Sequence, residues 1–216
     1  RRLHAAVGSA DAAPTGTASE QPPAVPDYAE LYERHALANP PATSIGSGDF
    51  DRIGEVELAI LVEAGLRPDS TLLDFGCGTG RLAVHAVPYL SAGRYIGTDI
   101  APTMLVHARQ LLTDRLGTVP DSVTLRVQPD EHFPTDRSVD VICAYSVFTH
   151  MEHEDAHRYL VSARRISSPT TAFVLSLLEI DNRDGRHFFL ESAGQTMSAR
   201  WAQVRNVVTS RDLFTE

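Results

Sequence analysis

Apolar side chains recur every three or four positions in two segments near the N-terminus, and this spacing predicts amphipathic helices. The first helix is expected to begin at the capping residue Asp27 and to stop at Asn39, which two prolines follow. The second is expected to begin after Asp49 and to end near Gly65. Residues 1–26 have almost no large apolar side chains, so we expect them to be flexible.

Beyond Gly65, short runs of apolar and β-branched residues alternate with helical patterns. The first run begins at Thr71, and four further strands are predicted at residues 94–99, 123–127, 138–144 and 171–178. The helices between them are predicted at residues 81–87, where Pro88 shortens or bends the helix, at 102–116 and at 154–165. This alternation predicts an α/β fold with a doubly wound, mostly parallel sheet and right-handed crossovers.

The residues after the fifth predicted strand have a weaker pattern. Residues 179–198 are charged and predict an irregular insertion, residues 201–208 predict another extended piece, and residues 210–214 begin a helix. We therefore expect one α/β core over residues 66–216, with an insertion near residues 179–198 that faces the substrate.

Composition narrows the possible partners and chemistry. The chain has 216 residues and a net charge of −9, so bulk electrostatics favour neither nucleic acid nor an anionic membrane surface as a partner. All 19 basic residues are arginine, which excludes Schiff-base, pyridoxal and P-loop chemistry that requires lysine. The two cysteines, Cys77 and Cys143, predict packing residues and no metal site or disulfide framework. No stretch approaches the roughly 20 apolar residues of a membrane span, so a soluble cytoplasmic protein is expected.

The most specific motif is the stretch TLLDFGCGTGRL, residues 71–82. A short apolar run leads through Asp74 to Gly76, Gly78 and Gly80, and a helical pattern follows. Three alternate glycines let the backbone adopt positive φ or approach a ligand closely, and the helix N-terminus favours an anionic group there. A dinucleotide site would space its glycines as G-x-G-x-x-G instead. A tight strand-to-helix turn without any ligand is the other alternative.

This stretch resembles the first motif of the class I S-adenosylmethionine-dependent methyltransferases, in which an acid, one spacer and G-x-G-x-G end the first strand. The resemblance covers residues 72–178. It implies a Rossmann-like methyltransferase fold, S-adenosylmethionine as cofactor, and cofactor contacts from Asp74, Cys77 and the three glycines. The family normally adds a further helix and an antiparallel pair of strands after the fifth strand. Residues 179–216 do not predict them, so we expect these C-terminal strands to be truncated or to be left out of the given residues.

A second match lies in YIGTDIAPTML, residues 95–105. Asp99 ends a predicted strand about twenty residues beyond the glycines, where doubly wound sheets place a carboxylate on the ribose hydroxyls. The resemblance places Ile100 beside the adenine and adds Met104 to the cofactor site. The alternative for Asp99 is a simple cap on the following helix.

The family holds the adenine amino group with an acid or amide after the third strand. Here the spacing departs from the family, because Asp130 lies one residue nearer Pro134 than is usual. Gln128, Asp130 and Glu131 all remain candidates, and Asp130 is narrowly preferred.

The loop after the fourth strand, residues 145–151, is expected to face the transferable methyl group, because ligands lie at the carboxyl ends of strands in open α/β sheets. We expect Tyr145 and Ser146 at the cofactor, and Phe148 and Thr149 near the acceptor. His150 is the first candidate for a general base, and His153 and His187 are the next candidates. Alternatively, His150 is a structural residue at a helix start that hydrogen-bonds to the backbone.

The family often covers its site with N-terminal segments, so residues 27–65 are predicted to form a helical lid. Tyr28 and Tyr32 then become substrate contacts, or they only pack the helix onto the domain. His187 in the insertion is the remaining substrate candidate.

The sequence therefore favours an S-adenosylmethionine-dependent methyltransferase that acts on a small molecule, preferably at oxygen, by direct in-line transfer. Such a reaction depends mainly on proximity and orientation. No metal, nucleic-acid or membrane partner is expected. Two alternatives stay open, namely a non-methylating reaction such as cyclisation on the same fold, and a non-catalytic binding subunit.

Overall fold

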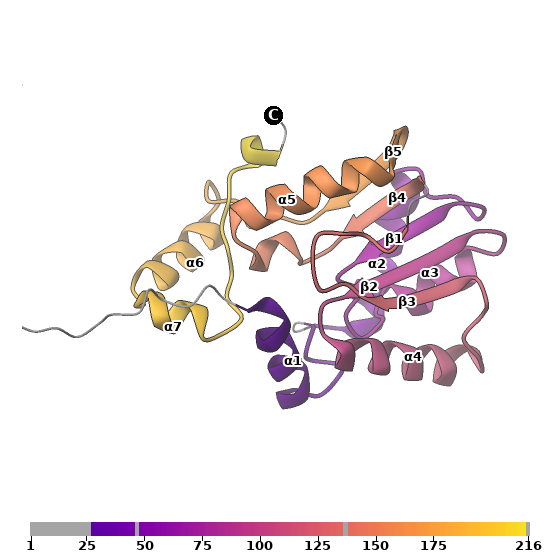
Figure 1. Cartoon of the computed structure of the whole chain (residues 1–216), viewed down its shortest axis with the longest axis horizontal. Helices are drawn as coiled ribbons and strands as arrows, with labels where there is room; N and C mark the ends of the chain where they lie inside the picture. The colour runs from indigo at the N-terminus through magenta and orange to yellow at the C-terminus, as the bar shows by residue number, and fades with distance from the viewer. Residues whose placement is uncertain (1–26, 46–47, 136–137, 215–216) are drawn as a thin grey trace, which may run out of the picture.

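Five parallel strands form one sheet in the order β3-β2-β1-β4-β5 in the computed structural model, which describes residues 27–45, 48–135 and 138–214 (Figure 1). The predicted doubly wound α/β fold is confirmed. The segment 1–26, expected to be flexible, lies outside the described residues. The strands are β1 Thr71–Phe75, β2 Arg94–Asp99, β3 Val123–Val127, β4 Val139–Ala144 and β5 Ser167–Leu175.

Helices cover both faces of the sheet (Figure 1). The α-helices are α1 Tyr28–Ala38, α2 Phe50–Glu63, α3 Ala83–Tyr89, α4 Pro102–Leu116, α5 His153–Ala163, α6 Arg183–Ala193 and α7 Met197–Trp201. Short 3₁₀ helices are η1 Phe148–His150, η2 Arg164–Ile166 and η3 Arg211–Phe214.

Buried residues alternate between the two sides of each central strand. In β1, Leu72 belongs to a cluster with α2, α3 and α4, whereas Leu73 belongs to a cluster with Ala163 at the end of α5. Both leucines are fully buried. A strand covered on both faces needs a continuous apolar run, which explains why the sequence pattern identified these strands.

The direction in which strands are added to the sheet reverses between β1 and β4, which lie side by side near its centre. Successive strands extend from β1 to β2 and β3 on one side, and the chain then crosses back to β4 and β5. In parallel sheets the crevice at such a switch point, outside the carboxyl ends of the strands, is where ligands bind.

Several predicted boundaries differ from the structure. The first crossover helix begins at Ala83 and continues through Pro88 to Tyr89, because a proline in the last turn removes only one helical hydrogen bond. β5 begins at Ser167, four residues earlier than predicted, because its pairing extends to Val139 across a register shift.

The prediction of an irregular segment at residues 179–198 is wrong. Asn182 accepts a hydrogen bond from Gly185 N at 2.7 Å and caps α6. The expected extended piece at 201–208 is also only partly present, because Trp201 ends α7, and the chain then extends to a parallel bridge between Thr209 and Glu179.

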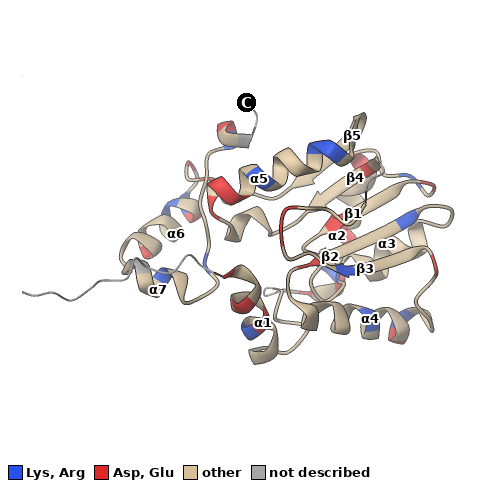
Figure 2. Ribbon diagram, viewed as in Figure 1, with Lys and Arg blue, Asp and Glu red and all other residues tan. Residues whose placement is uncertain are grey.

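Charges are mixed over this fold. In the view of Figure 2, arginines lie among acidic residues on α1, α4, α5 and α6 and form no continuous basic strip. Among the described residues, no helix has the length and hydropathy needed to cross a membrane.

Candidate functional site

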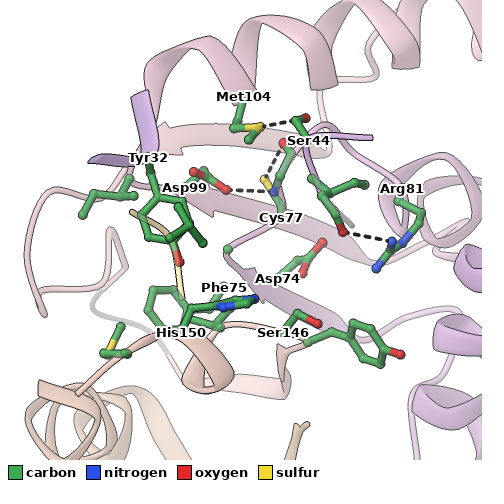
Figure 3. A pocket seen from close by; sticks show the side chains of 18 of the residues that line it. Tyr32, Ser44, Asp74, Phe75, Cys77, Arg81, Asp99, Met104, Ser146 and His150 are labelled. Carbon is green, nitrogen blue, oxygen red and sulfur yellow. Dashed lines mark hydrogen bonds between the residues drawn. The ribbon is translucent and has the colours of Figure 1, made fainter. Parts of the chain in front are cut away.

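A cavity of about 530 Å³ lies at the carboxyl ends of β1, β2, β3 and β4, where α1 also contributes to its wall (Figure 3). Its floor contains the turn after β1 and the residues that directly follow the other three strands. The volume falls within the range of small-molecule sites, roughly 300–1,000 Å³.

The turn after β1 has a shape that only glycine allows. Gly78 and Gly80 have φ of +55° and +90°. A Cβ on Gly78 would lie 2.5 Å from the Ile45 side chain, and one on Gly80 would lie 3.2 Å from Ala108 in α4. The glycines therefore let the turn fit between its neighbours and leave its backbone facing the cavity.

Asp99 at the end of β2 is bonded directly to this turn. One carboxylate oxygen accepts a hydrogen bond from Gly78 N at 2.9 Å, and the other accepts one from Ala101 N at 2.9 Å. Burial raises the pKa of Asp99 to about 6, although these N–H donors act in the opposite direction. The carboxylate lies in the cavity wall with its orientation fixed.

Asp74 lies beneath the turn at the end of β1. Tyr95 donates a hydrogen bond of 2.5 Å to its carboxylate. Burial raises the pKa of Asp74 to about 7, and this effect exceeds the opposing effect of the Tyr95 hydrogen bond. Two buried carboxyl groups in one cavity with raised pKa values favour a ligand that carries positive charge or hydroxyl donors.

Gln128, directly after β3, has an unusual side chain. It is 2% exposed, and both its amide oxygen and its amide nitrogen are buried without a hydrogen-bond partner among the described residues. Its backbone N–H donates to Asp99 O at 2.9 Å, which holds it beside the ribose candidate. A buried amide without partners costs roughly 1–3 kcal/mol, which makes Gln128 on the cavity wall a candidate to bind a polar ligand group.

Arg81 and Glu57 line another part of the cavity. The Arg81 guanidinium donates to Glu57 of α2 at 2.5 Å and stands 5.6 Å from the centre of the Tyr145 ring. Its Nε is buried and has no partner among the described residues. Arg81 therefore has one donor without a partner among the described residues, while Glu57 holds the guanidinium in place.

His150 contributes a polar group to a more apolar region of the cavity. Its Nδ1 lies 2.8 Å from the carbonyl oxygen of Arg205, and burial lowers the pKa of His150 below its usual value. The Tyr32 hydroxyl and the His150 ring point toward one another in Figure 3. Tyr28, Met151 and Tyr159 complete this aromatic and sulfur-lined region.

Comparison with known proteins agrees with this geometry. Residues 73–173 match a family model described as a methyltransferase domain. This segment includes the glycine turn, Asp99, Gln128 and His150. Residues 73–173 therefore form a methyltransferase domain, and the fold is that of the class I S-adenosylmethionine-dependent methyltransferases. S-adenosylmethionine is the cofactor that this family uses.

Curated relatives match only in part. The chain is 40% identical over 74 residues to the ribosomal protein L11 methyltransferase of Photobacterium profundum. This alignment covers 34% of this chain and 24% of that protein. It is 29% identical over 115 residues to cyclopropane mycolic acid synthase 1 of Mycobacterium tuberculosis. This second alignment covers 53% of this chain and 38% of the synthase. The chain thus spans well under half the length of these relatives.

The fold extends further than the sequence similarity. Magnesium protoporphyrin IX methyltransferase from Synechocystis, solved with bound S-adenosylhomocysteine, superposes with a TM-score of 0.57 at 18% identity. The match covers 87% of this chain and 81% of that one. At this identity the comparison establishes the Rossmann-like methyltransferase fold and nothing finer.

The fold brings most of the predicted site residues to this cavity. Those that line it are Tyr28, Tyr32, Asp74, Gly76, Cys77, Gly78, Asp99, Ile100, Met104, Tyr145, Ser146 and His150. Ser146 has a φ of +56°, a strained value for a residue with a side chain, and its N–H donates to Ser176 Oγ at 2.7 Å. Strain of this kind concentrates at ligand sites. The roles assigned to these residues stay predictions.

Several predicted residues do not line the cavity, among them Thr149, His153 and Glu131. Asp130 is exposed and bonds to His132 N at 2.9 Å, because the loop turns outward after Gln128. Phe148 is 2% exposed and packs in the core, with its ring 6.1 Å from Phe75. The His187 side chain is 69% exposed on α6, beside Glu191. Gly80 does not face the cavity but lets the glycine turn pack against Ala108 of α4.

The sequence pattern gave no signal for several cavity residues. Arg81 and Glu57 meet only because α2 packs beside the glycine turn, and Val204 and Asn206 reach the cavity from the end of the chain. For Arg81 the one indication in the sequence is its position in the motif stretch GTGRL, directly after the last glycine. Among the described residues, no cluster of acids, histidines and cysteines could hold a metal ion.

The buried acids predict an unusual pH dependence of stability. Asp74 and Asp99 have pKa values of about 7 and about 6 in the fold, against an ordinary value of 3.8. Between about pH 4 and pH 7 the folded chain retains protons that the unfolded chain has lost, so these groups make unfolding easier as pH rises through this window. Each pKa unit corresponds to about 1.4 kcal/mol, or about 3–6 °C in melting temperature.

Calorimetric melting of the ligand-free protein at several pH values checks this dependence, with Asp74→Asn as the matched variant. The wild-type protein should lose stability relative to Asp74→Asn as pH increases from 5 to 8. A constant difference between the two proteins across this range would contradict the assignment of a raised Asp74 pKa.

Proposed function

We propose that this chain transfers a methyl group from S-adenosylmethionine to an oxygen atom of a small molecule. One observation carries the proposal: a single cavity joins the glycine turn, Asp99 and Gln128 to a histidine with a free ring nitrogen. The first three groups suit a nucleoside and its amino-acid tail, and the histidine suits an acceptor hydroxyl group.

The residues present fit the cofactor. Asp99 would accept hydrogen bonds from the ribose hydroxyls, and the unpartnered Gln128 amide would bind the edge of the adenine. Asp74 and Arg81 would hold the ammonium and carboxylate of the amino-acid tail, since Arg81 Nε is buried without a partner. When bound, S-adenosylmethionine supplies a methyl group on a sulfonium, which departs as a neutral thioether on in-line attack.

The acceptor would lie among the aromatic residues of the cavity. Tyr28 and Tyr32 come from α1, which we propose as the lid over the site. Burial raises the pKa of Tyr32 above its ordinary value, so its hydroxyl stays protonated and can donate to the acceptor oxygen. Among the described residues Arg81 is the one arginine that lines this cavity, and we assign it to the cofactor, so an uncharged acceptor fits the proposal.

The protein contributes mainly orientation and proton transfer. The walls align the acceptor oxygen and exclude water, which provides the larger part of the rate. His150 Nε2 accepts the hydroxyl proton as the oxygen gains its methyl group, and the resulting imidazolium later releases that proton to water. The lowered pKa of His150 keeps the ring neutral, and hence active, at pH values below its ordinary midpoint. The proton transfer to His150, followed as kcat against pH, should therefore slow only below about pH 6.5.

Replacing Gln128 by leucine should change binding and stability in opposite directions. The free protein should be as stable or more stable, because a buried amide without partners is removed. Affinity for S-adenosylhomocysteine should fall about tenfold or more, through loss of roughly 1–3 kcal/mol of hydrogen bonding. Calorimetric binding and thermal melting measure both effects.

The exposed Gln110 on α4, replaced in the same way, is the control. If Gln128→Leu left the affinity unchanged, the adenine assignment would be wrong, and Glu131 would become the next candidate.

Turnover is tested by incubating the protein with S-adenosylmethionine and a panel of phenols, alcohols, amines and unsaturated lipids. We expect S-adenosylhomocysteine together with an oxygen-linked product heavier by one methylene unit. A cyclised lipid product would instead favour the second candidate, cyclisation, for which the similarity to the mycobacterial synthase is the motive. Cofactor binding without release of S-adenosylhomocysteine on any acceptor class would favour a non-catalytic subunit.

A further inference from the structure

The end of the described chain lies along the loop that carries His150. Val207 N donates to Thr149 O at 2.7 Å, and His153 Nε2 donates to Val208 O at 3.2 Å. Val207 and Thr209 are both buried. We call residues 204–209 the C-terminal strap, because they bind a loop more than 50 residues earlier in the sequence.

The strap determines which nitrogen of His150 carries the proton. A carbonyl oxygen can only accept a hydrogen bond, so the Nδ1 atom that lies 2.8 Å from Arg205 O must be the N–H. Burial lowers the pKa of His150 and favours the neutral ring, although the hydrogen bond to the Arg205 carbonyl acts in the opposite direction; His35 adds a smaller lowering effect. The Nε2 lone pair is then left free, because no described residue donates a hydrogen bond to it.

The side chain of Arg205 is held by a separate contact. It forms an ion pair with Glu152, the residue at the N-cap of α5 and two positions after His150. The Arg205 side chain is 18% exposed. The Glu152 backbone N–H donates to the Tyr28 hydroxyl at 3.1 Å, and that hydroxyl donates to Asp155 at 3.1 Å. The ion pair therefore lies where α1, the loop after β4 and the strap meet.

We propose that Arg205 is a positioning residue for His150: its ion pair with Glu152 holds its own carbonyl oxygen on Nδ1, and so keeps Nε2 as the proton acceptor. The side chain of Arg205 binds Glu152 in the loop after β4, while its backbone carbonyl accepts the hydrogen bond from the His150 ring. The effect on turnover rests on the proposed function, but the effect on the ring does not.

The proposal is tested on the ring itself in the free protein. Nitrogen and carbon NMR shifts of His150 report the ratio of the Nδ1–H to the Nε2–H tautomer. The wild-type protein should contain the Nδ1–H form. Arg205→Gln and Glu152→Gln should each lower the ratio of the two forms about tenfold, as expected for loss of one hydrogen bond of about 1.4 kcal/mol.

The two single variants also separate positioning from simple electrostatics. Removing a cation and removing an anion should shift the His150 pKa in opposite directions, whereas loss of positioning should shift the tautomer ratio in the same direction. His35 and Tyr32 from α1, together with His153, also face this region, so the ring is followed across the pH range in each variant. The charge-exchanged double variant E152R/R205E should restore much of the wild-type ratio.

Arg158→Gln is the control, because Arg158 on the same helix α5 pairs with Glu131 at 2.9 Å and should leave the ratio unchanged. An unchanged tautomer ratio in both Arg205→Gln and Glu152→Gln would overturn the proposal, and Glu152→Gln alone suffices if the other variant does not fold. In an active enzyme, kcat should fall in both variants while the KM for the cofactor is preserved. A wild-type ring in the expected tautomer without any methyl transfer would count against the proposed function only.

Discussion

Replacing His150 by alanine should lower kcat by about 10²–10⁴-fold, the usual contribution of a positioned general base. His150 has the required state, because Nδ1 is bonded to the Arg205 carbonyl and the lowered pKa keeps the ring neutral. Affinity for S-adenosylhomocysteine should stay within about twofold of wild type, since the nucleoside contacts lie on the other strands. Steady-state kinetics on an identified acceptor, combined with calorimetric binding, measure both quantities.

His153→Ala is the matched control for this variant. His153 also donates to a carbonyl oxygen of the strap, that of Val208, but it does not line the cavity. Its removal should cost stability and little turnover. Equal losses of kcat in the two variants would show that His150 serves the packing of the strap and not proton transfer.

Replacing Asp99 by alanine should weaken S-adenosylhomocysteine binding by about 100-fold or more. Charge-assisted hydrogen bonds from a buried carboxylate to ligand hydroxyls are worth about 1.5–3 kcal/mol each, and every 1.4 kcal/mol changes affinity tenfold. The variant also leaves Gly78 N and Ala101 N without their acceptors, which loosens the glycine turn. Calorimetric titration measures the loss, and thermal melting checks that the variant is folded.

Asp130→Ala serves as the comparison, because Asp130 lies outside the cavity and is exposed. It should bind the nucleoside as the wild type does. If Asp99→Ala retained wild-type affinity, the ribose assignment would fail. If Asp130→Ala lost affinity instead, the loop after β3 would have to turn inward in the bound state.

Local features of the site could be predicted from the sequence because they depend on adjacent residues. A strand that leads into three alternate glycines needs only the backbone geometry of its own turn, and Asp99 follows from the length of one strand-helix-strand unit. The choice between Gln128 and Asp130 depended on which way the chain turns after β3. The spacing to Pro134 could not determine that direction.

Features that depend on tertiary contacts escaped prediction. The Arg81–Glu57 ion pair joins residues 24 positions apart, and the contact of His150 with Arg205 joins residues 55 positions apart. α6 was missed because charged residues surround its short apolar stretch and its Asn182 cap was not recognised. The sequence therefore predicted His187 as a substrate contact in an irregular insertion, whereas His187 lies on the exposed side of a helix.

The most direct test of the central claim is a crystal structure of the chain with S-adenosylhomocysteine. We expect the ribose on the Asp99 carboxylate, the adenine against Gln128, and the sulfur in front of the region that His150 and Tyr32 line. The nucleoside found outside the cavity, or a cavity that stays closed to it at saturating concentration, would contradict the account.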